Sequence, residues 1–205
     1  KPLLFGIVQG GIYEDLRKES LAQLERIGFD GYAIGGVSVG ESRADVLQVI
    51  RWIAPLLPQD KPRYLMGLGK PEEIVYAAYL GVDMFDCVIP TREARHGTVY
   101  TWKSDNPERD VHHYIDQLQD TTKTATLPSE SFFKVVKIAR QEYRSDTSSI
   151  DPYATWAGSQ DYSKAYIRHL FQVKEHMALE YLSRHNLHFY LDMMRYIRSY
   201  KQGNH

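Results

Sequence analysis

Asp86 is the side chain in this sequence with the clearest potential for chemistry. It lies near the end of the apolar run MFDCVI (residues 84–89), where an unpaired carboxylate costs free energy. A carboxylate at such a position can act as a nucleophile and form a covalent intermediate, as in glycosyl transfer through an oxocarbenium-like transition state. A salt bridge to Arg92 or Arg95 explains the same residue equally well from the spacing alone. Both interpretations stay open at this point.

Glycines and small polar groups follow the other apolar segments. Gln9 comes directly after the first segment, and its amide can both donate to and accept from the edge of a heterocycle. Gly35 and Gly36 follow the second segment and allow a ligand to approach the backbone closely, although a tight turn is the more ordinary explanation. Glu41 is a further polar candidate, or it caps the helix that follows it.

These residues need elements that bring them to one edge of a sheet. The sequence pattern predicts strands over residues 3–8, 31–34, 62–65 and 84–89, with helices over 13–27, 43–53 and 72–80. Strands joined by helical crossovers run parallel. In a β/α barrel the active site forms at the carboxyl ends of such strands, which is where the candidate residues fall.

The first helix and the second half of the chain carry further predictions. In the first helix we expect Arg17 to face solvent and the apolar residues to face the core, namely Leu16, Leu21, Leu24 and Ile27. Residues 102–131 are polar and are interpreted as an insertion with one short helix over 110–118. A strand is predicted over 132–138, and two helices over 162–182 and 187–200, separated at 183–186.

Composition excludes several classes of protein. The 205 residues carry 25 Lys and Arg against 26 Asp and Glu, and a net charge of -1 does not fit a polycation that coats nucleic acid. The single cysteine, Cys87, excludes an intramolecular disulfide framework or a thiolate-rich metal site made by this chain alone. No apolar run approaches the roughly 20 residues that span a bilayer, and no leader precedes the first strand, so we expect a soluble, cytoplasmic protein that makes no membrane contact. The chain opens on Lys1 rather than Met, which suggests that it begins within a larger polypeptide.

Four long motifs, in order, closely resemble the tRNA-guanine transglycosylases, the queuine or preQ1 tRNA-ribosyltransferases. They are FGIVQGG (5–11), GFDGYAIGGVSVGE (28–41), KPRYLMGLGKPEEI (61–74) and GVDMFDCVIPTREARHG (81–97). The similarity continues through YRSDTSSIDP (143–152) and residues 162–198. It implies an α/β fold in which residues 1–101 form the C-terminal half of a (β/α)8 TIM barrel. The 102–131 insertion follows, and residues 132–205 form a C-terminal helical subdomain like the family's zinc subdomain.

The resemblance also implies roles for individual residues. The reaction is exchange of guanine at the wobble position of tRNA for a 7-deazaguanine base, preQ1 or queuine, in queuosine biosynthesis. Asp86 is the nucleophile that holds the ribose until the new base attacks. The substrate-binding positions are Gln9, Gly35, Gly36, Val37, Ser38, Glu41 and Met66, and the positions near the RNA are Arg92 and Arg95. Val39 fits the bulkier pocket of bacterial enzymes that use preQ1.

One departure from the family concerns the missing half of the barrel. The family's general acid/base aspartate and a further base-recognising aspartate lie in the N-terminal half, which this chain does not contain. We therefore expect as partners tRNA, a 7-deazaguanine base and the missing half in the same or another chain, with a homodimer as a further arrangement. The alternative is a non-catalytic tRNA-binding or scaffold subunit, or one half of a split enzyme. Base exchange at another position of archaeal tRNA, or on DNA, is a nearer alternative.

A second departure concerns zinc. The family's ligands follow an Asp-Pro pair as C-x-C-x-x-C with a later histidine, but here the cysteine positions hold Ala154, Trp156 and Ser159, and only His185 remains. One imidazole cannot hold a structural zinc, which takes about four ligands, so we expect no zinc and no other cofactor. Trp156 is expected to replace the metal by apolar packing, and His185 to be a packed or capping histidine. A modest excess of Lys and Arg over residues 161–205 fits a phosphate-binding face or ordinary solvated helix charge.

Overall fold

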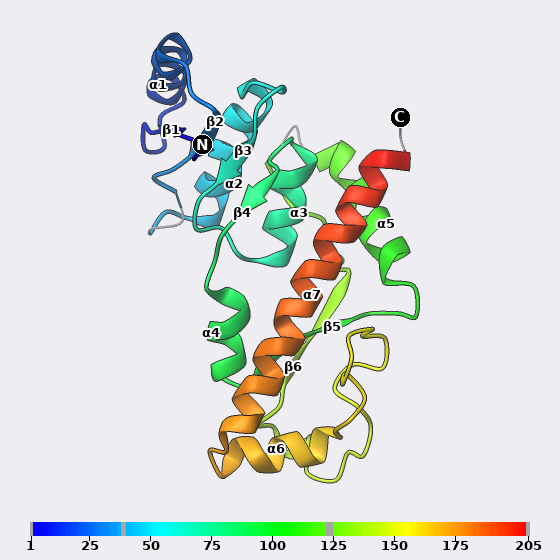
Figure 1. Cartoon of the computed structure of the whole chain (residues 1–205). Coiled ribbons are helices and arrows are strands. Elements are labelled where there is room, and N and C mark those ends of the chain that lie inside the picture. Colours follow the sequence, from blue (N-terminus) through cyan, green and yellow to red (C-terminus); the bar gives the residue numbers. More distant parts are fainter. Residues whose placement is uncertain (1, 38–39, 122–124, 204–205) are drawn as a thin grey trace. The chain divides into compact units, whose positions relative to one another are not determined.

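Figure 1 shows the structure, a computed structural model that describes residues 2–37, 40–121 and 125–203. The chain divides into two compact units, of which unit 1 comprises residues 1–87 and 115–129 and unit 2 comprises residues 88–114 and 130–205. Each unit has its own sheet. Within the described residues, no helix combines the length and the apolar character that crossing a membrane requires.

Unit 1 is built on a four-stranded parallel sheet in the order β1-β2-β3-β4. The strands are β1 (Phe5–Val8), β2 (Gly31–Ile34), β3 (Arg63–Leu65) and β4 (Met84–Phe85). The crossovers are α1 (Glu14–Ile27), α2 (Arg43–Ile53), which a 3-10 helix (Ala54–Leu56) continues, and α3 (Pro71–Tyr79). The predicted alternation of four strands and three helices, and with it the mixed α/β class, is confirmed. The barrel half stays a prediction.

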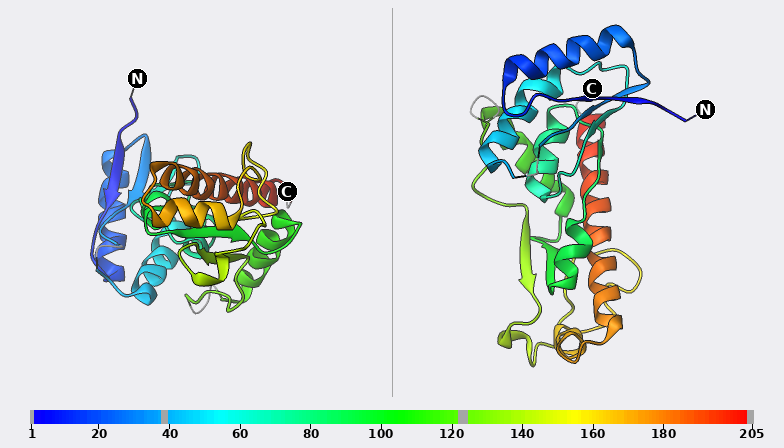
Figure 2. Two further views of the ribbon diagram at one scale, coloured as in Figure 1. Left: turned by 90° about the horizontal axis from the view of Figure 1, so that it is seen from below. Right: turned by 90° about the vertical axis from the view of Figure 1, so that its left-hand side faces the viewer.

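The register of the sheet sets its carboxyl ends side by side. Val8 pairs with Ile34, Ile34 pairs with Leu65, and Leu65 pairs with Phe85. Val8, Ile34 and Leu65 are fully buried, and Figure 2 shows α1 lying along β1. Because parallel strands end at one edge, the residues that follow these four positions leave the sheet together. The candidate residues near the strand ends therefore lie in neighbouring connections.

Helix α1 buries a different face from the predicted one. Gly28 ends the helix with a φ of 81°, as expected for a left-handed terminal residue. Leu21 is buried, but Leu16 and Ile27 are exposed, and Arg17 is fully buried. Arg17 lies about one helical turn before Leu21 and therefore shares its face. The expectation that Arg17 faces solvent was wrong. It was based on the charge of the side chain, whereas the position of Arg17 on the helix places it on the buried face.

The fourth strand is shorter than predicted. It covers Met84 and Phe85 instead of residues 84–89, and helix α4 (Ile89–Arg95) begins soon after it. Pro90 lies in the first turn of α4, where its missing N–H leaves no helical bond unmade. Asp86 consequently lies in the connection after the strand.

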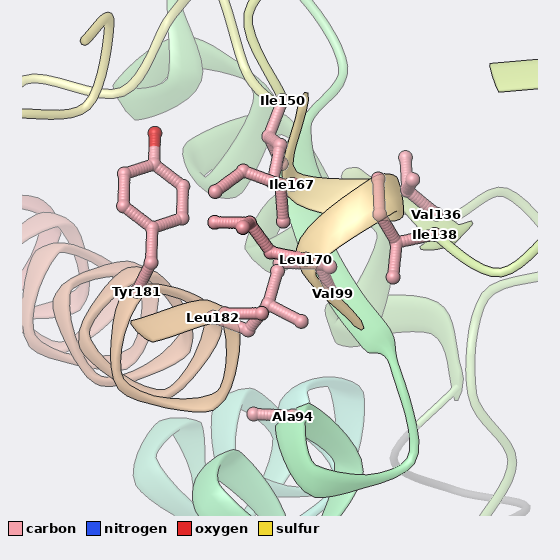
Figure 3. Packing of buried hydrophobic residues seen from close by; sticks show 10 residues of the cluster. Ala94, Val99, Val136, Ile138, Ile150, Ile167, Leu170, Tyr181 and Leu182 are labelled. Atoms are coloured by element: carbon pink, nitrogen blue, oxygen red, sulfur yellow. The ribbon is translucent and has the colours of Figure 1, made fainter. Parts of the chain in front are cut away.

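Unit 2 combines an antiparallel strand pair with helices. β5 (Thr98–Trp102) pairs with β6 (Phe133–Lys137); β6 confirms the strand predicted at 132–138, whereas β5 has no predicted counterpart. A 3-10 helix (Gln141–Tyr143) follows β6, and α7 (His176–Gly203) packs against α4, β5 and α6 (Lys164–Gln172). Figure 3 shows the packing of the core residues, which are Ala94, Val99, Val136, Ile138, Ile150, Ile167, Leu170, Ala178, Tyr181 and Leu182.

The C-terminal helices are separated at a different place from the predicted one. The chain leaves the helical conformation at residues 173–175, where Lys174 has a φ of 60°, and residues 183–186 lie inside α7. Asn186, which suggested a loop, is fully buried. Its side chain accepts from Tyr100 N at 3.1 Å and donates to Pro90 O at 2.9 Å and Thr98 O at 3.1 Å. These bonds satisfy the buried amide, which explains how a polar residue is accommodated in the interior of α7.

The polar insertion contains a longer helix than predicted. Helix α5 (Pro107–Thr121) replaces the expected helix over 110–118, and the Asn106 side chain accepts from Arg109 N at 3.0 Å at its start. The helix contributes residues to both units. Its buried residues follow helical spacing between the charges, and they are Val111, Tyr114, Ile115 and Leu118.

Candidate active site

Asp86 is held by two hydrogen-bond donors from β3 and the loop that follows it. Tyr64 donates its hydroxyl to Asp86 Oδ1 at 2.6 Å, and the Gly67 N–H donates to the same oxygen at 2.8 Å. Gly67 adopts a φ of 72°, a left-handed conformation that costs glycine little. The other carboxylate oxygen, Oδ2, receives neither of these bonds. The two donors therefore fix the carboxylate by one oxygen.

The same bonds favour the charged form of Asp86. The Tyr64 hydroxyl, and after it the Gly67 N–H, hold the pKa of Asp86 below its ordinary value. In return, the bond to Asp86, together with burial and the carboxylate charge, raises the pKa of Tyr64 to about 12. At neutral pH Tyr64 is therefore a donor and Asp86 an anion, which is the state that a carboxylate nucleophile needs.

The structure corrects the expectation that Asp86 is buried. Its side chain is exposed, because β4 ends at Phe85 and Asp86 lies beyond it. Directed hydrogen bonds, rather than the cost of desolvation, set its properties. Asp83, before β4, is different: Arg63 Nε and Nη2 donate to its two oxygens at 3.0 and 3.1 Å. Asp83 is thus paired within the fold, whereas Asp86 is oriented at the carboxyl end of the strand.

Gln9, Gly35, Gly36 and Met66 come together at the carboxyl ends of β1, β2 and β3. A Cβ atom on Gly35 would lie 2.9 Å from Gln9 Nε2 and 3.5 Å from Met66 Sδ. Gly36 has a φ of 61°, and a Cβ atom there would collide with Gln9 Oε1. Gly36 is therefore favoured by its left-handed backbone conformation, whereas at Gly35 a Cβ atom would crowd Ile7 and the Gln9 amide. That these residues bind a base stays a prediction.

The connection after β2 holds the remaining predicted positions. Val37 is buried, whereas Ser38 and Val39 lie outside the described residues. Glu41 is half-buried, and its charge raises the pKa of a nearby arginine, Arg17, against the effect of burial. Glu41 does not cap α2, because the hydroxyl of Ser42 fills that role by accepting from Asp45 N at 3.2 Å.

Arg92 and Arg95 lie three residues apart in α4 and are both exposed. This spacing puts the two cations on the same side of the helix. Arg92 Nε lies 3.7 Å from the Glu93 carboxylate, an exposed pair. Since α4 belongs to unit 2 and Asp86 to unit 1, the salt bridge considered from the sequence stays a prediction.

Two residues of the site escaped the sequence reasoning. Tyr64 precedes Met66 by two residues, the spacing that places strand residues on one face, so the position of Met66 contained the signal. Arg17 lies on the buried face of α1 with Leu21, and no carboxylate at i+3 or i+4 in the sequence suggested a charge pair. Its partners are backbone carbonyls, which no sequence pattern identifies.

Fold and site together describe a parallel β/α protein that collects polar groups, among them an oriented carboxylate, at the carboxyl ends of its strands. The chain belongs to the queuine tRNA-ribosyltransferase family, whose model matches residues 1–202. It is 43% identical over 195 residues to the queuine tRNA-ribosyltransferase of Francisella tularensis subsp. novicida, covering 95% of this chain and 45% of that protein. The corresponding enzyme of Solidesulfovibrio magneticus is 42% identical over 196 residues, covering 96% and 44%. The chain thus spans about half the length of the curated relatives it matches, and the resemblance seen in the motifs is confirmed.

The residues at the family's zinc positions do not fit a metal site. Ser159 is buried, and its hydroxyl donates to Ala154 O at 3.0 Å. Trp156 Nε1 donates to His185 Nδ1 at 3.4 Å, and His185 Nε2 donates to Tyr100 O at 2.8 Å. Both imidazole nitrogens are therefore engaged, with the proton on Nε2. Across the described ranges, no three His, Cys, Asp or Glu side chains are placed to hold a metal ion together.

His185 is a buried, neutral side chain in this cluster. Burial lowers the pKa of His185, although Asp151 Oδ2 lies 4.0 Å from its Nε2 and acts in the opposite direction. The Trp156 ring stacks on His188, with the ring centroids 5.4 Å apart and an interplanar angle of 5°. Aromatic packing and hydrogen bonds thus connect the segment around Trp156 to α7 and β5.

Proposed function

We propose that this chain supplies the nucleophile and the base pocket of a tRNA-guanine transglycosylase. Asp86 Oδ2 attacks C1′ of the wobble nucleotide, the C1′–N9 bond breaks, and guanine leaves with the bonding electrons and takes up a proton. A 7-deazaguanine base, preQ1 or queuine, then attacks C1′, gives up its proton and displaces the Asp86 carboxylate. The exchange involves no oxidation or reduction, and Asp86 is regenerated.

The geometry of Asp86 is the single observation that carries this proposal. A nucleophilic carboxylate must be ionised and held in a fixed orientation. Tyr64 and Gly67 provide both conditions through Oδ1 and leave the bonds of Oδ2 to the substrate.

The neighbouring residues fit recognition of a flat heterocycle. We propose that the Gln9 amide and the backbone around Gly36 hydrogen-bond the base edge, and that Met66 packs on the ring. Arg92 and Arg95 contact phosphates of the tRNA. The group that moves the proton comes from the remainder of the enzyme, because the family resemblance places the general acid/base aspartate in the barrel half that this chain does not contain.

The test is base exchange by the complete enzyme that contains this chain. Incorporation of labelled preQ1 into unmodified tRNA is expected for the wild type, together with a protein–tRNA adduct that survives denaturation. Asp86→Asn removes the nucleophile, so the adduct disappears and kcat falls by roughly a thousandfold or more. Asp83→Asn is the matched control, since Asp83 is the paired carboxylate of the same region, and its adduct remains.

The same experiment separates the enzyme from the non-catalytic alternative. A wild type that binds tRNA but never exchanges base, even when the missing barrel half is present, identifies a tRNA-binding or scaffold subunit. An Asp86→Asn variant that still forms the adduct contradicts the assignment of the nucleophile.

We further propose that unit 2 of this protein folds without zinc. Support comes from the engaged nitrogens of His185 and from the aromatic packing of Trp156. The cluster is a cross-link of the same segments that a metal would connect, made of a Trp–His–carbonyl chain of hydrogen bonds.

A further inference from the structure

Arg17 is fully buried, and its guanidinium connects the two loops that form the candidate base pocket. It reaches from α1 toward the connections after β1 and β2. Nε donates to Gly11 O at 2.5 Å, Nη1 to Gly35 O at 3.0 Å and to Val8 O at 3.4 Å, and Nη2 to Gly36 O at 2.9 Å. All four acceptors are backbone carbonyls at or just beyond the ends of the two strands.

A buried cation of this kind is costly for a purely structural purpose. Burial lowers the pKa of Arg17, and the nearby Glu41 charge offsets this only in part. A methionine or leucine would fill the same space at α1 without any desolvated charge. The neighbouring backbone is also adapted to Arg17, because a Cβ atom on Gly10 would lie 2.7 Å from Arg17 Cγ. The guanidinium is thus fitted to its site, and what it holds is the main chain of the loops.

Holding these carbonyls also sets the direction of the peptide N–H groups. In a planar trans peptide the C=O and the following N–H point in opposite directions. When Gly35 O and Gly36 O point at the guanidinium, the N–H groups of Gly36 and Val37 point away from it. The planar fork of arginine fixes both peptides at once, which a lysine ammonium cannot do with the same geometry.

We propose that Arg17 is a positioning residue for recognition of a purine-like base, a role that rests on the proposed function. It does not touch the substrate. It fixes the peptides of Gly35 and Gly36 and the turn at Gly11, so that Gln9 and the backbone donors are ordered before the base arrives. Binding then costs less conformational entropy than it would with free loops.

The test compares Arg17→Met with the wild type in the complete enzyme. We expect the KM for the free base to rise about tenfold with the KM for tRNA little changed, and the melting temperature to fall because backbone carbonyls lose their donor. Lys18→Met is the matched control, because Lys18 is the adjacent, exposed cation of α1 and pairs with Glu14. Arg17→Lys should recover only part of the base affinity, and added guanidinium should lower the base KM of Arg17→Ala.

The outcome that overturns the proposal is a folded Arg17→Met enzyme with an unchanged base KM. If Arg17→Met does not fold, the decision passes to Arg17→Lys: an unchanged base KM overturns the proposal and a raised one supports it. Failure of the proposed function is seen separately, as a wild type without exchange. In that case calorimetric titration with preQ1 decides: weaker binding by the Arg17 variants than by the wild type supports the positioning role, and equal or absent binding overturns it.

Discussion

The two units of this protein use buried polar side chains in opposite ways. In unit 1, Arg17 bonds backbone carbonyls of the loops after β1 and β2, which carry the candidate base-binding residues Gln9 and Gly36. In unit 2, His185 and Asn186 are buried in α7 and bond the backbone of β5. We propose that the first set of bonds orders loops for ligand binding, whereas the second joins elements of the core of unit 2. The role of a buried polar residue therefore depends on whether its backbone partners lie in loops of the candidate site or in the core.

The largest of these effects is expected from a substitution that disrupts the hydrogen bonds of Trp156, His185 and Tyr100 in unit 2. His185→Leu keeps the volume but leaves Tyr100 O and Trp156 Nε1 without the partners they have now. Loss of a partner costs a buried polar group about 1–3 kcal/mol and a half-buried one such as Trp156 less, so we expect a loss of about 2 kcal/mol in the free energy of unfolding. Urea titration measures it, with the exposed His169→Leu as control. A loss equal to that of the control contradicts the proposed cross-link.

A smaller effect is expected at the open site of unit 1. Tyr64→Phe removes the first donor to Asp86 Oδ1, so the pKa of Asp86 rises toward its ordinary value. Because exchange needs the carboxylate, the acidic limb of the pH–rate profile moves to higher pH, and kcat falls about tenfold. Stability is expected to change little, because Asp86 is exposed. A pH profile that does not move excludes Tyr64 from the control of Asp86.

The smallest effect is expected from treatment with a chelator, which tests whether unit 2 is held together without a metal ion. If unit 2 folds without zinc, as proposed, dialysis against a chelator should change neither the melting temperature nor the exchange rate. Elemental analysis of the purified protein checks the same point directly. About one bound zinc per chain, lost together with stability, would contradict a metal-free unit 2.

The parallel core was predictable because each strand and helix of unit 1 is marked by local sequence. Apolar runs end in glycine, and amphipathic segments connect them, so the four strands follow from spacing alone. Unit 2 was harder. β5 was missed although its partner β6 was found, and the break before α7 was predicted at residues 183–186, about ten residues too late.

The sequence indicated residues that follow a strand but not residues that bind the backbone. Asp86, Gln9 and Gly36 were candidates from their positions after apolar segments, whereas Arg17 was assigned to solvent and Tyr64 was overlooked. The burial expected for Asp86 was wrong because β4 ends at Phe85, four residues before the predicted end of the strand. A side chain such as Arg17 that donates to backbone carbonyls has no partner side chain that could be recognised in the sequence, so its role becomes visible only in the structure.

Asn186 has a mechanical consequence for the arginines of α4. Its amide links Pro90 at the start of α4 to Tyr100 and Thr98 of β5, and α7 also packs directly against both elements. The helix that carries Arg92 and Arg95 is therefore held by buried hydrogen bonds as well as by packing within unit 2. The proposed contact with tRNA phosphates would thus be made from a helix whose first turn is anchored in the core of unit 2.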